Sequence, residues 1–174
     1  MAAMTPHSDS AVTVVAPLDA LVAGGRTVLG LHLAAIGPDH FTGLAECLLA
    51  AKPEVGDLRQ AKTSVTQALK GEHGKLLPGA SPVALADGQV VGSLQIVAHP
   101  DSPPEVIELF VHPDWRRRGV ASAMLASAAS RLRLTGFAAI TMTAPVSESA
   151  VCAALGFEQR RLHDADLEQS STSS

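Results

Sequence analysis

The sequence predicts an α/β domain, because strand-like and helix-like patterns alternate along the second half of the chain. Residues 105–111 (EVIELFV) are rich in β-branched and apolar side chains, which favours a strand. Residues 120–132 repeat apolar or small side chains at every fourth position, the spacing of an amphipathic helix. Residues 137–143 (FAAITMT) predict a second buried strand. The small side chains of the helix allow it to lie close to a sheet.

The first of these strands has two predictable faces. Strict alternation assigns Glu108 and Phe110 to one face and Ile107, Leu109 and Val111 to the other. The HPD sequence that follows ends the strand. Glu108 is therefore expected on the face opposite to most of the strand's apolar side chains.

One more helix and one more strand complete the predicted second half. The Thr-Gly pair at residues 135–136 ends the long helix, and Ser147 begins a short one. The Gly-Phe pair at residues 156–157 turns the chain into a last strand that ends near Leu162.

The start of the chain has weaker patterns. Residues 12–15 predict a first strand, and Asp19 is a candidate N-cap for a helix running toward Ile36. Three glycines within residues 24–30 (GGRTVLG) weaken that helix prediction. The same stretch lacks both the GxGxxG spacing and the P-loop lysine, so we do not expect it to be a phosphate site.

The middle of the chain predicts two helices and a hairpin. The helices cover residues 41–51 and 55–69, with Pro53 between them. The hairpin has strands at residues 83–85 and 90–97, joined by an Asp-Gly turn.

Length and composition favour a single domain over residues 11–163. The chain has 174 residues, and 47% of them are hydrophobic, which is enough for one core. Residues 1–10 are polar and are expected to be flexible, and residues 164–174 form a polar tail that is expected to be disordered.

The charge and the cysteines restrict the classes of partner. A formal net charge of −4 argues against nonspecific binding to nucleic acid. Cys47 and Cys152 lack CxxC or histidine-ligand spacing, so we expect neither a disulfide framework nor a metal site. No uninterrupted apolar stretch reaches ~18 residues, and the start lacks the pattern of a signal peptide. A soluble protein of the reducing cytoplasm, without a membrane partner, is the expectation.

Three consecutive arginines stand at the start of the predicted helix, in the sequence RRRGVA at residues 116–121. A helix N-terminus already carries the positive end of the dipole, so cations there are unfavourable by roughly 0.3–1 kcal/mol each. A bound anion reverses that sign, and backbone amides with arginine forks around them suit a phosphate or pyrophosphate. The alternative is a solvated surface cluster at a helix end, in an α/β domain of another kind.

The sequences ELFVHPDWRRRGVASAML (residues 108–125) and AVCAALGFEQR (residues 150–160) resemble the GNAT superfamily of acetyltransferases. The resemblance covers residues 106–162. In that family the acetyl-CoA loop reads Gln or Arg, two variable residues, Gly, one variable residue, then Gly or Ala; here Arg116, Gly119 and Ala121 fill the defined positions. The resemblance implies a mixed, mostly antiparallel central sheet flanked by helices, with the acceptor site lined by the N-terminal helices.

The resemblance also implies how acetyl-CoA, as cosubstrate, would be held. The strand backbone would hold the pantetheine and acetyl group, and the loop with the first turn of the helix would hold the pyrophosphate. The expected strand residues are Leu109, Phe110 and Val111, and the expected loop residues are Arg116, Arg117, Arg118, Gly119, Val120 and Ala121. These are mostly backbone roles, so Gly119 matters more than the arginine side chains, because a side chain there would crowd the phosphate.

Acyl transfer to an amine requires a base, because free alkylamines have a pKa of about 10. Glu108 is the candidate, acting through water; family members often carry a carboxylate on this strand facing the acceptor cleft. Its alternative role is a strand carboxylate paired with a nearby arginine. His112 and His99 are weaker candidates, for the base and for substrate contact. Trp115 is expected to pack over the turn.

The sequence departs from the family at the general acid. Many members have a tyrosine three residues before the leucine of the LGF sequence, and this chain has Cys152 there and no tyrosine at all. Ser147 likewise replaces the asparagine common at the start of that helix. A thiol with a pKa near 8.5 is matched to a leaving thiolate, so Cys152 is the candidate acid, although a small buried apolar role is the alternative.

Two functions follow from the resemblance. The first is an N-acetyltransferase in which a primary amine of a small molecule or a protein attacks the thioester of acetyl-CoA directly. The second is a noncatalytic acyl-CoA-binding or interaction module on the same fold, suggested by the missing tyrosine. Homodimers are frequent in the family, and the sequence does not identify the acceptor.

Overall fold

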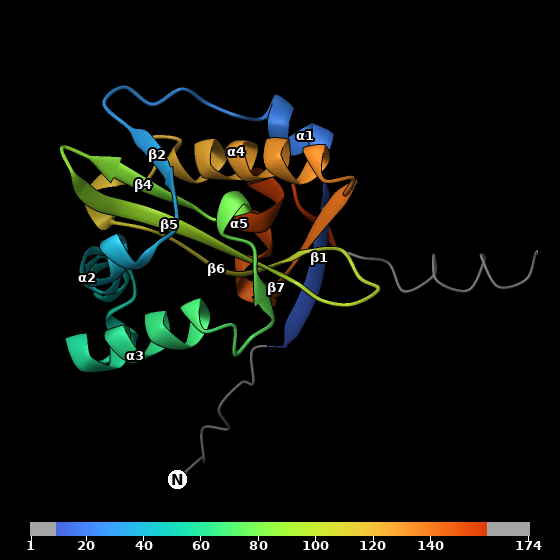
Figure 1. Cartoon of the computed structure of the whole chain (residues 1–174). Coiled ribbons are helices and arrows are strands. Elements are labelled where there is room, and N and C mark those ends of the chain that lie inside the picture. The colour runs from blue at the N-terminus through green and yellow to red at the C-terminus, as the bar shows by residue number, and fades with distance from the viewer. Residues whose placement is uncertain (1–9, 160–174) are drawn as a thin grey trace, which may run out of the picture.

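The computed structural model describes residues 10–159, in which the strands form one twisted mixed sheet (Figure 1). The expectations for residues 1–10 and 164–174 fall outside this range, apart from Ser10. The order across the sheet is β2-β4-β5-β6-β7-β1-β8, and β3 pairs with the end of β5, beyond the residues that pair with β4. The strands are β1 (Ala11–Pro17), β2 (His32–Ala35), β3 (Lys75–Leu76), β4 (Pro82–Ala86), β5 (Gln89–Ala98), β6 (Glu105–Val111), β7 (Ala139–Pro145) and β8 (Glu158–Gln159).

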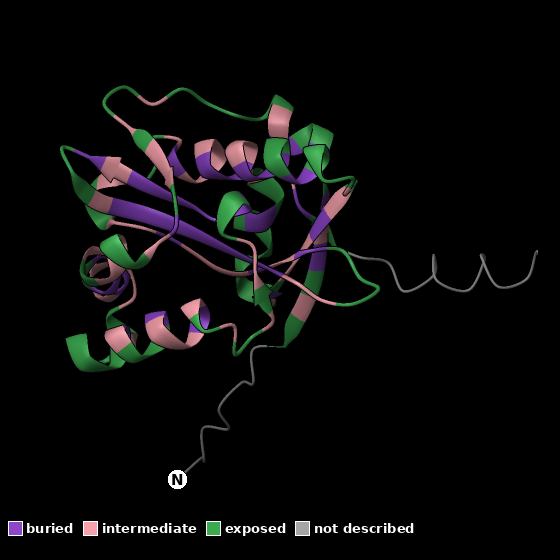
Figure 2. Ribbon diagram, in the orientation of Figure 1, coloured by how far each residue is buried: buried purple, intermediate pink, exposed green. Residues whose placement is uncertain are grey.

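Helices cover both faces of the sheet. The helices are α1 (Leu18–Ala23), α2 (Phe41–Ala51), α3 (Leu58–Leu69), α4 (Val120–Leu134) and α5 (Ser149–Ala154). Helices α1 and α4 lie together on one face, and α2 and α3 on the other (Figure 1). The central strands β4 and β5 are buried between these layers (Figure 2). Two apolar clusters result, a larger one around Met124 of α4 and a smaller one around Leu44 of α2.

Strand β6 contains a bulge that changes which side chains share a face. Glu108 pairs with Gln95 and Val106 pairs with Ile96, so Ile107 is an extra residue between them. Glu105 pairs with Val97, two residues from Gln95 on β5, so both carboxylates lie on the same face of the sheet. Strict alternation would separate two residues three positions apart. The predicted placement of Glu108 with Phe110 holds, since the alternation is regular beyond the bulge.

Strands β6 and β7 form the one parallel pair among the strands of residues 10–159, and they pair only at their starts. Glu105 pairs with Thr141 and Val106 with Met142, and no ladder pair follows along the rest of β6. The strands separate from the bulge onward. The β7-facing backbone edge of residues 109–111 is thereby left outside the ladder.

The region before β2 corrects a prediction. The predicted helix toward Ile36 is wrong: α1 ends at Ala23, because Gly24 and Gly25 follow it. Residues His32–Ala35 instead form β2, an edge strand that pairs with β4. Asp19 is not an N-cap, and its carboxylate Oδ1 lies 2.9 Å from Arg133 Nε at the end of α4.

Most other element predictions are confirmed within a few residues. Strand β1, helix α2, the β4–β5 hairpin and helix α4 form where the patterns predict them. Helix α3 begins later than predicted, at Leu58, because Asp57 caps it in a reciprocal capping box with Gln60. Strand β7 is shifted two residues toward the C-terminus, and α5 begins at Ser149 after a 3₁₀ turn. The predicted end of the last strand near Leu162 lies outside the described residues.

No helix in the described part of the chain is long and apolar enough to cross a lipid bilayer.

Candidate functional site

The connection from β6 to α4 presents a bare helix N-terminus. A 3₁₀ turn (Pro113–Trp115) follows β6, and Gly119 is the N-cap of α4. Gly119 has φ +88°, in the left-handed region that glycine adopts without strain. The first amides of any helix have no intrahelical acceptor, and at α4 no N-cap side chain supplies one either. This end of α4 can therefore accept an anion.

Two of the three arginines in the loop make contacts with other residues of the protein, although all three are exposed. Arg116 donates from its guanidinium to Ala51 O at 2.7 Å and to Val111 O at 3.3 Å. The Arg118 guanidinium lies over the Trp115 ring, 4.9 Å from its centroid, in a cation–π contact. These contacts shape the loop, and the interpretation of Trp115 as packing over the turn is confirmed.

Gly119 is crowded by a residue from the glycine-containing segment near α1. A Cβ placed on Gly119 would lie 3.1 Å from Arg26 Cδ. The sequence reasoning did not connect Arg26 with this loop, since no local pattern predicts that residues so far apart in the chain meet.

A cavity of about 360 Å³ occupies the opening between β6 and β7, and we call it the β6–β7 cavity. It brings together the predicted residues Glu108, Leu109, Phe110, Val111, Ala121 and Cys152. Its remaining lining is Val106, Ile107, Met142, Thr143, Ala144, Pro145, Lys52, Glu148, Val151 and Leu155. The cavity therefore extends from the bulge of β6 to the first turn of α4 and across to α5.

A second cavity, of about 400 Å³, lies between α3 and the sheet, and we call it the α3 cavity. Its polar lining comes from α3, the loop after α3, and strands β5, β6 and β7: Ser64, Gln67, His73, Gln95, Glu105, Glu108 and Thr143. Four residues line both cavities: Val106, Ile107, Glu108 and Thr143. The two cavities thus adjoin at the bulge, with the Glu108 carboxylate among the groups they share.

Glu108 is paired with a lysine from the other side of the site. Lys52 Nζ donates a hydrogen bond to Glu108 Oε1. Both side chains are partly exposed, Glu108 by 26% and Lys52 by 38%, so the pair is reachable by solvent and by a small ligand. The alternative predicted for Glu108 was a pair with an arginine, and the cation is instead Lys52.

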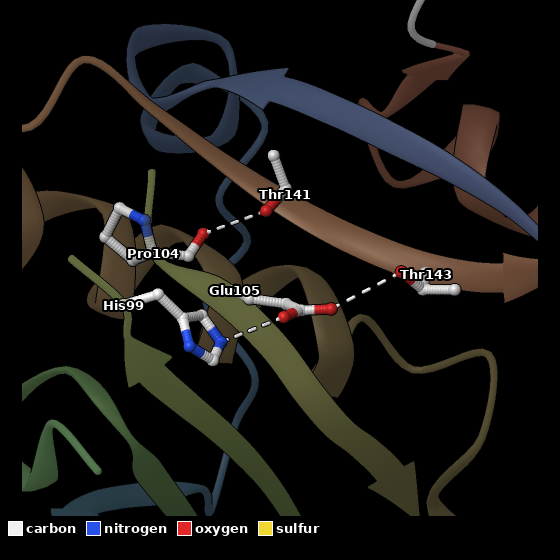
Figure 3. A network of polar contacts seen from close by, with 5 residues as sticks. All are labelled: His99, Pro104, Glu105, Thr141 and Thr143. Carbon is white, nitrogen blue, oxygen red and sulfur yellow. Dashed lines mark hydrogen bonds and ion pairs between the residues drawn. The ribbon is translucent and has the colours of Figure 1, made fainter. Parts of the chain in front are cut away.

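The second carboxylate, Glu105, holds the start of the opening in place (Figure 3). Its two oxygens contact His99 Nε2 at 3.1 Å and Thr143 Oγ1 at 3.3 Å. Beside it, Thr141 donates to Pro104 O from its backbone amide at 2.9 Å and from its hydroxyl at 3.3 Å. His99, a weaker sequence candidate, thus pairs with Glu105 rather than with Glu108.

Gln95 adds an unmet hydrogen-bond acceptor to the α3 cavity. It stands directly opposite Glu108 on β5 and is only 2% exposed. Its Oε1 has no hydrogen-bond partner within residues 10–159. A buried carbonyl without a donor is costly, so a ligand or water donating here would be stabilised.

Cys152 lies on α5 with its side chain buried against the β6–β7 cavity. Burial raises the pKa of its thiol above the ordinary value of 9.0, and the nearby Glu148 carboxylate raises it further. The thiol is therefore protonated at neutral pH. It can act as a proton donor, and it is a poor nucleophile.

The other cysteine and the other histidine candidate lie elsewhere. Cys47 and His112 line a separate cavity between α2 and the β4–β5 turn. Burial raises the pKa of the Cys47 thiol to about 11, partly offset by a backbone hydrogen bond involving His112. His112 Nδ1 accepts from Asp114 N at 3.3 Å, which fits a role in the turn.

Sequence reasoning missed Lys52, Gln95 and Glu105. Lys52 follows directly after a predicted helix, and nothing local indicates that it reaches β6. Gln95 and Glu105 stood in predicted strands, and a polar residue within the apolar run of β5 was a usable signal. The bulge that gathers them depends on the pairing of β5 with β6.

Comparison with known proteins finds a family match over part of the chain. The acetyltransferase (GNAT) domain family matches residues 79–159. Mycothiol acetyltransferase of Mycolicibacterium vanbaalenii is 50% identical over 48 residues, which are 28% of this chain and 16% of that protein. The match therefore spans a small part of that relative.

Solved structures show the same fold. A functionally unknown conserved protein from Staphylococcus epidermidis aligns with a TM-score of 0.68 and 14% identity over 86% of this chain and 57% of that chain. A GCN5-related N-acetyltransferase from Sphaerobacter thermophilus aligns with a TM-score of 0.64 and 14% identity, over 86% of this chain and 48% of that chain. The aminoglycoside N-acetyltransferase AAC(6')-Iy in complex with CoA aligns with a TM-score of 0.60 and 19% identity, over 79% of this chain and 93% of that chain.

The chain spans only about half of the first two structures, 57% and 48%. The predicted mixed, mostly antiparallel sheet with flanking helices is confirmed by these neighbours and by the strand pairing. Residues 79–159 therefore match the acetyltransferase (GNAT) domain family, and the described part of the chain has the fold of GNAT acetyltransferases.

Proposed function

We propose that the protein transfers an acetyl group from acetyl-CoA to a primary amine by direct attack of the amine on the thioester. The observation that carries this proposal is the meeting of two cavities at Glu108. One cavity opens toward the N-terminus of α4 and the other is lined by polar groups, so a coenzyme and an acceptor can approach one carboxylate from two sides.

The β6–β7 cavity suits acetyl-CoA. Because β7 leaves the ladder after Val106, the free edge of Leu109, Phe110 and Val111 can pair with the amides of a pantetheine chain. The amides of residues 118–121 at the bare helix end would hold the pyrophosphate. Arg117 in the same loop is exposed and has φ +59°, and its guanidinium would add positive charge near the pyrophosphate. Bound in this way, acetyl-CoA supplies the activated acyl group.

Glu108 is the proposed base. An ammonium group must lose a proton before its nitrogen can attack, and a carboxylate at the junction of the two cavities can take it directly or through water. The incoming amine must exchange places with Lys52 on Glu108. Backbone amides of β6 would stabilise the thioester oxygen as negative charge develops.

Cys152 is the proposed acid for the leaving thiolate. Its thiol is buried on the wall of the same cavity and keeps its proton at neutral pH, because burial and Glu148 raise its pKa. A leaving CoA thiolate is itself a weak base with a pKa near 8.5, so this assistance is expected to be modest.

A small amine is the proposed acceptor. The α3 cavity of about 400 Å³ has the size of a small-molecule site and carries the carboxylates Glu105 and Glu108 and the unmet Gln95 Oε1. The similar proteins named above include an acetyltransferase of mycothiol and one of aminoglycosides, which supports a small-molecule acceptor over a protein.

The second candidate function is an acyl-CoA-binding module without turnover. The chain has no tyrosine to serve as the family's usual acid, and Lys52 already occupies the proposed base. This reading predicts coenzyme binding without amine-dependent chemistry.

Calorimetry with acetyl-CoA, CoA and desulfo-CoA, followed by release of free thiol in the presence of an amine panel, separates the two candidates. Micromolar binding with amine-dependent thiol release supports the enzyme. Binding without release on any amine supports the module, and failure to bind acetyl-CoA contradicts both.

A further inference from the structure

The ammonium group of Lys52 lies where an acceptor amine would have to be. Its Nζ donates to Glu108 Oε1, the group proposed to take the acceptor's proton. Lys52 also lines the β6–β7 cavity, the proposed place of the thioester. A primary amine, a base and an acyl donor would therefore be neighbours before any external acceptor arrives.

The backbone of Lys52 is fixed on both sides, so this placement is a property of the fold. Lys52 is the C-cap of α2, and its amide donates to Leu48 O at 2.8 Å. The preceding carbonyl, Ala51 O, accepts the 2.7 Å hydrogen bond from Arg116 of the coenzyme loop. Pro53 then starts a 3₁₀ turn that carries the chain away. The side chain is thereby directed from the end of α2 to β6.

We propose that Lys52 is itself an acetyl acceptor: when no external amine is present, the protein transfers the acetyl group of acetyl-CoA to Lys52 Nζ. This inference rests on the proposed function, because it uses the same coenzyme and the same base. It adds a modification site within this chain to the transfer onto external amines.

The step balances as an acyl transfer. One proton of the Lys52 ammonium passes to Glu108 and then to water, and the neutral nitrogen attacks the thioester carbon. The C–N bond forms as the C–S bond breaks. The second proton lost by the nitrogen ends on the CoA thiolate, so free CoA and one released proton accompany the amide. No oxidant or further reactant is needed.

Acetylation would remove the positive charge that is paired with Glu108. The acetamide cannot form an ion pair, so Glu108 would lose its cation and the junction of the cavities would become more negative by one charge. A cationic acceptor would then no longer compete with Lys52 for the carboxylate. Self-acetylation is therefore expected to change the KM for cationic amines more than kcat.

The first test is the mass of the intact protein after incubation with acetyl-CoA and no amine, followed by peptide mapping. We expect one acetyl group on Lys52, at a rate independent of protein concentration because the transfer is intramolecular. The rate should fall by about 100-fold or more in Glu108→Gln, as expected for loss of a base. In Lys52→Arg no acetyl group should be gained at this position.

Lys70 is a matched internal control for nonspecific chemical acetylation. It is the C-cap of α3 as Lys52 is of α2, and it lines a different cavity, on the outer side of α3. Equal labelling of Lys52 and Lys70, or labelling of Lys52 that Glu108→Gln leaves unchanged, would overturn the inference.

The outcomes also separate this inference from the proposed function. Loss of acetyl-CoA binding would overturn both. Acetyl-CoA binding and amine turnover without an acetyl group on Lys52 would overturn this inference alone. An acetyl group on Lys52 without turnover of any external amine would support this inference and contradict the proposed acetylation of external amines.

A second readout needs no acyl transfer. Desulfo-CoA lacks the reacting sulfur, and its binding should protect Lys52 from reductive methylation by formaldehyde and borohydride while Lys70 reacts as before. Peptide mass spectrometry measures both positions in one sample. Equal methylation of Lys52 with and without desulfo-CoA would place its amine outside the coenzyme cavity and contradict the proposal.

Discussion

Glu108, the proposed base, lines both cavities and is paired with one cation, Lys52. Its pair with Lys52 is partly exposed, so its contribution to folding stability is expected to be small, at most about 1 kcal/mol. Changes at Glu108 should therefore affect turnover far more than stability.

Glu108→Gln keeps the size of the side chain and removes its ability to accept a proton. We expect kcat to fall by about 100-fold to 10,000-fold, the usual range for a lost base. Binding of acetyl-CoA, measured by calorimetry, should be unchanged because the proposed coenzyme contacts are mainly backbone groups of β6 and α4. Turnover that survives the substitution would show that another group or water takes the proton.

Cys152 predicts an alkaline limit to turnover. A general acid acts only while it is protonated, and burial together with Glu148 raises the pKa of this thiol above 9.0. The kcat of the natural protein should therefore hold through neutral pH and fall only above pH 9, as the thiol loses its proton.

Cys152→Ala should lower kcat by less than about 100-fold and abolish that alkaline fall, because the acid is gone at every pH. The measurement is the pH profile of kcat at saturating substrate for both proteins. If Cys152 serves only packing, kcat and its profile stay unchanged while unfolding free energy falls by about 1 kcal/mol.

At the scale of elements, the bulge in β6 decides what the site contains. Period-two alternation correctly groups Glu108 with Phe110, because that half of the strand is regular. It places Glu105 on the opposite face, and only the pairing with β5 reveals Ile107 as the extra residue that brings Glu105 back. A bulge is a property of two paired strands, so one strand's sequence does not predict it.

Helix prediction succeeded where its signals were local. Helix α2 matches residues 41–51 because an apolar pattern ends at a proline two residues later. Strand β2 was missed because it has four residues and its partner β4 lies about fifty residues further along the chain, as expected for an edge strand defined by a distant neighbour.

A substitution in the first turn of α4 can test whether this helix end binds the pyrophosphate of acetyl-CoA. Ala121 lines the β6–β7 cavity in the first turn, where an acidic residue stabilises a helix by about 0.3–1 kcal/mol through the dipole. Ala121→Glu should therefore keep or raise the melting temperature while its charge repels the pyrophosphate and weakens acetyl-CoA binding about 100-fold or more.

Ala121→Gln has nearly the same volume without the charge and is the matched control. Calorimetry should show a clearly smaller loss for Gln than for Glu. Equal losses would mean that volume alone matters, and no loss in either would remove the phosphate-loop proposal. Gly119 is less suited to this test, because its φ of +88° and the nearby Arg26 would make any side chain a structural change as well.

At the scale of the whole molecule, folding stability is expected to decline at alkaline pH. The Cys47 thiol ionises at an ordinary pKa of 9.0 when the chain is unfolded and at about 11 when it is folded. Its contribution to stability is therefore fully present below pH 9 and is lost as the pH rises to about 11. The chain has no tyrosine, which would otherwise titrate in the same range.

Urea midpoints across this range, compared with those of Cys47→Ala, measure the effect. The variant should show a flatter decline with pH, whatever its stability at neutral pH. Parallel declines in the two proteins would assign the alkaline loss to other groups.

The complete site could not be predicted from the sequence, because it is assembled across the chain. The strand, the loop and the helix that follows are one local stretch, and its motif predicts them together. Lys52 reaches Glu108 across 56 positions, and Cys152 lines the same cavity from α5. Those juxtapositions are products of sheet order and helix packing, which a local pattern does not contain.

Arg116 connects the proposed coenzyme loop with the proposed acceptor side, because its guanidinium donates to Ala51 O, next to Lys52, while its backbone lies in that loop. A ligand that stiffens this loop should also stiffen the end of α2, so we expect CoA to tighten acceptor binding, by at least about fivefold, and the acceptor to tighten CoA equally. Calorimetric titration of each ligand with the other present tests this, and Arg116→Gln should abolish the gain while Arg117→Gln keeps it. Because this coupling is reciprocal, each substrate would slow the loss of the other, and the complex with both bound would be favoured over a complex with either one alone.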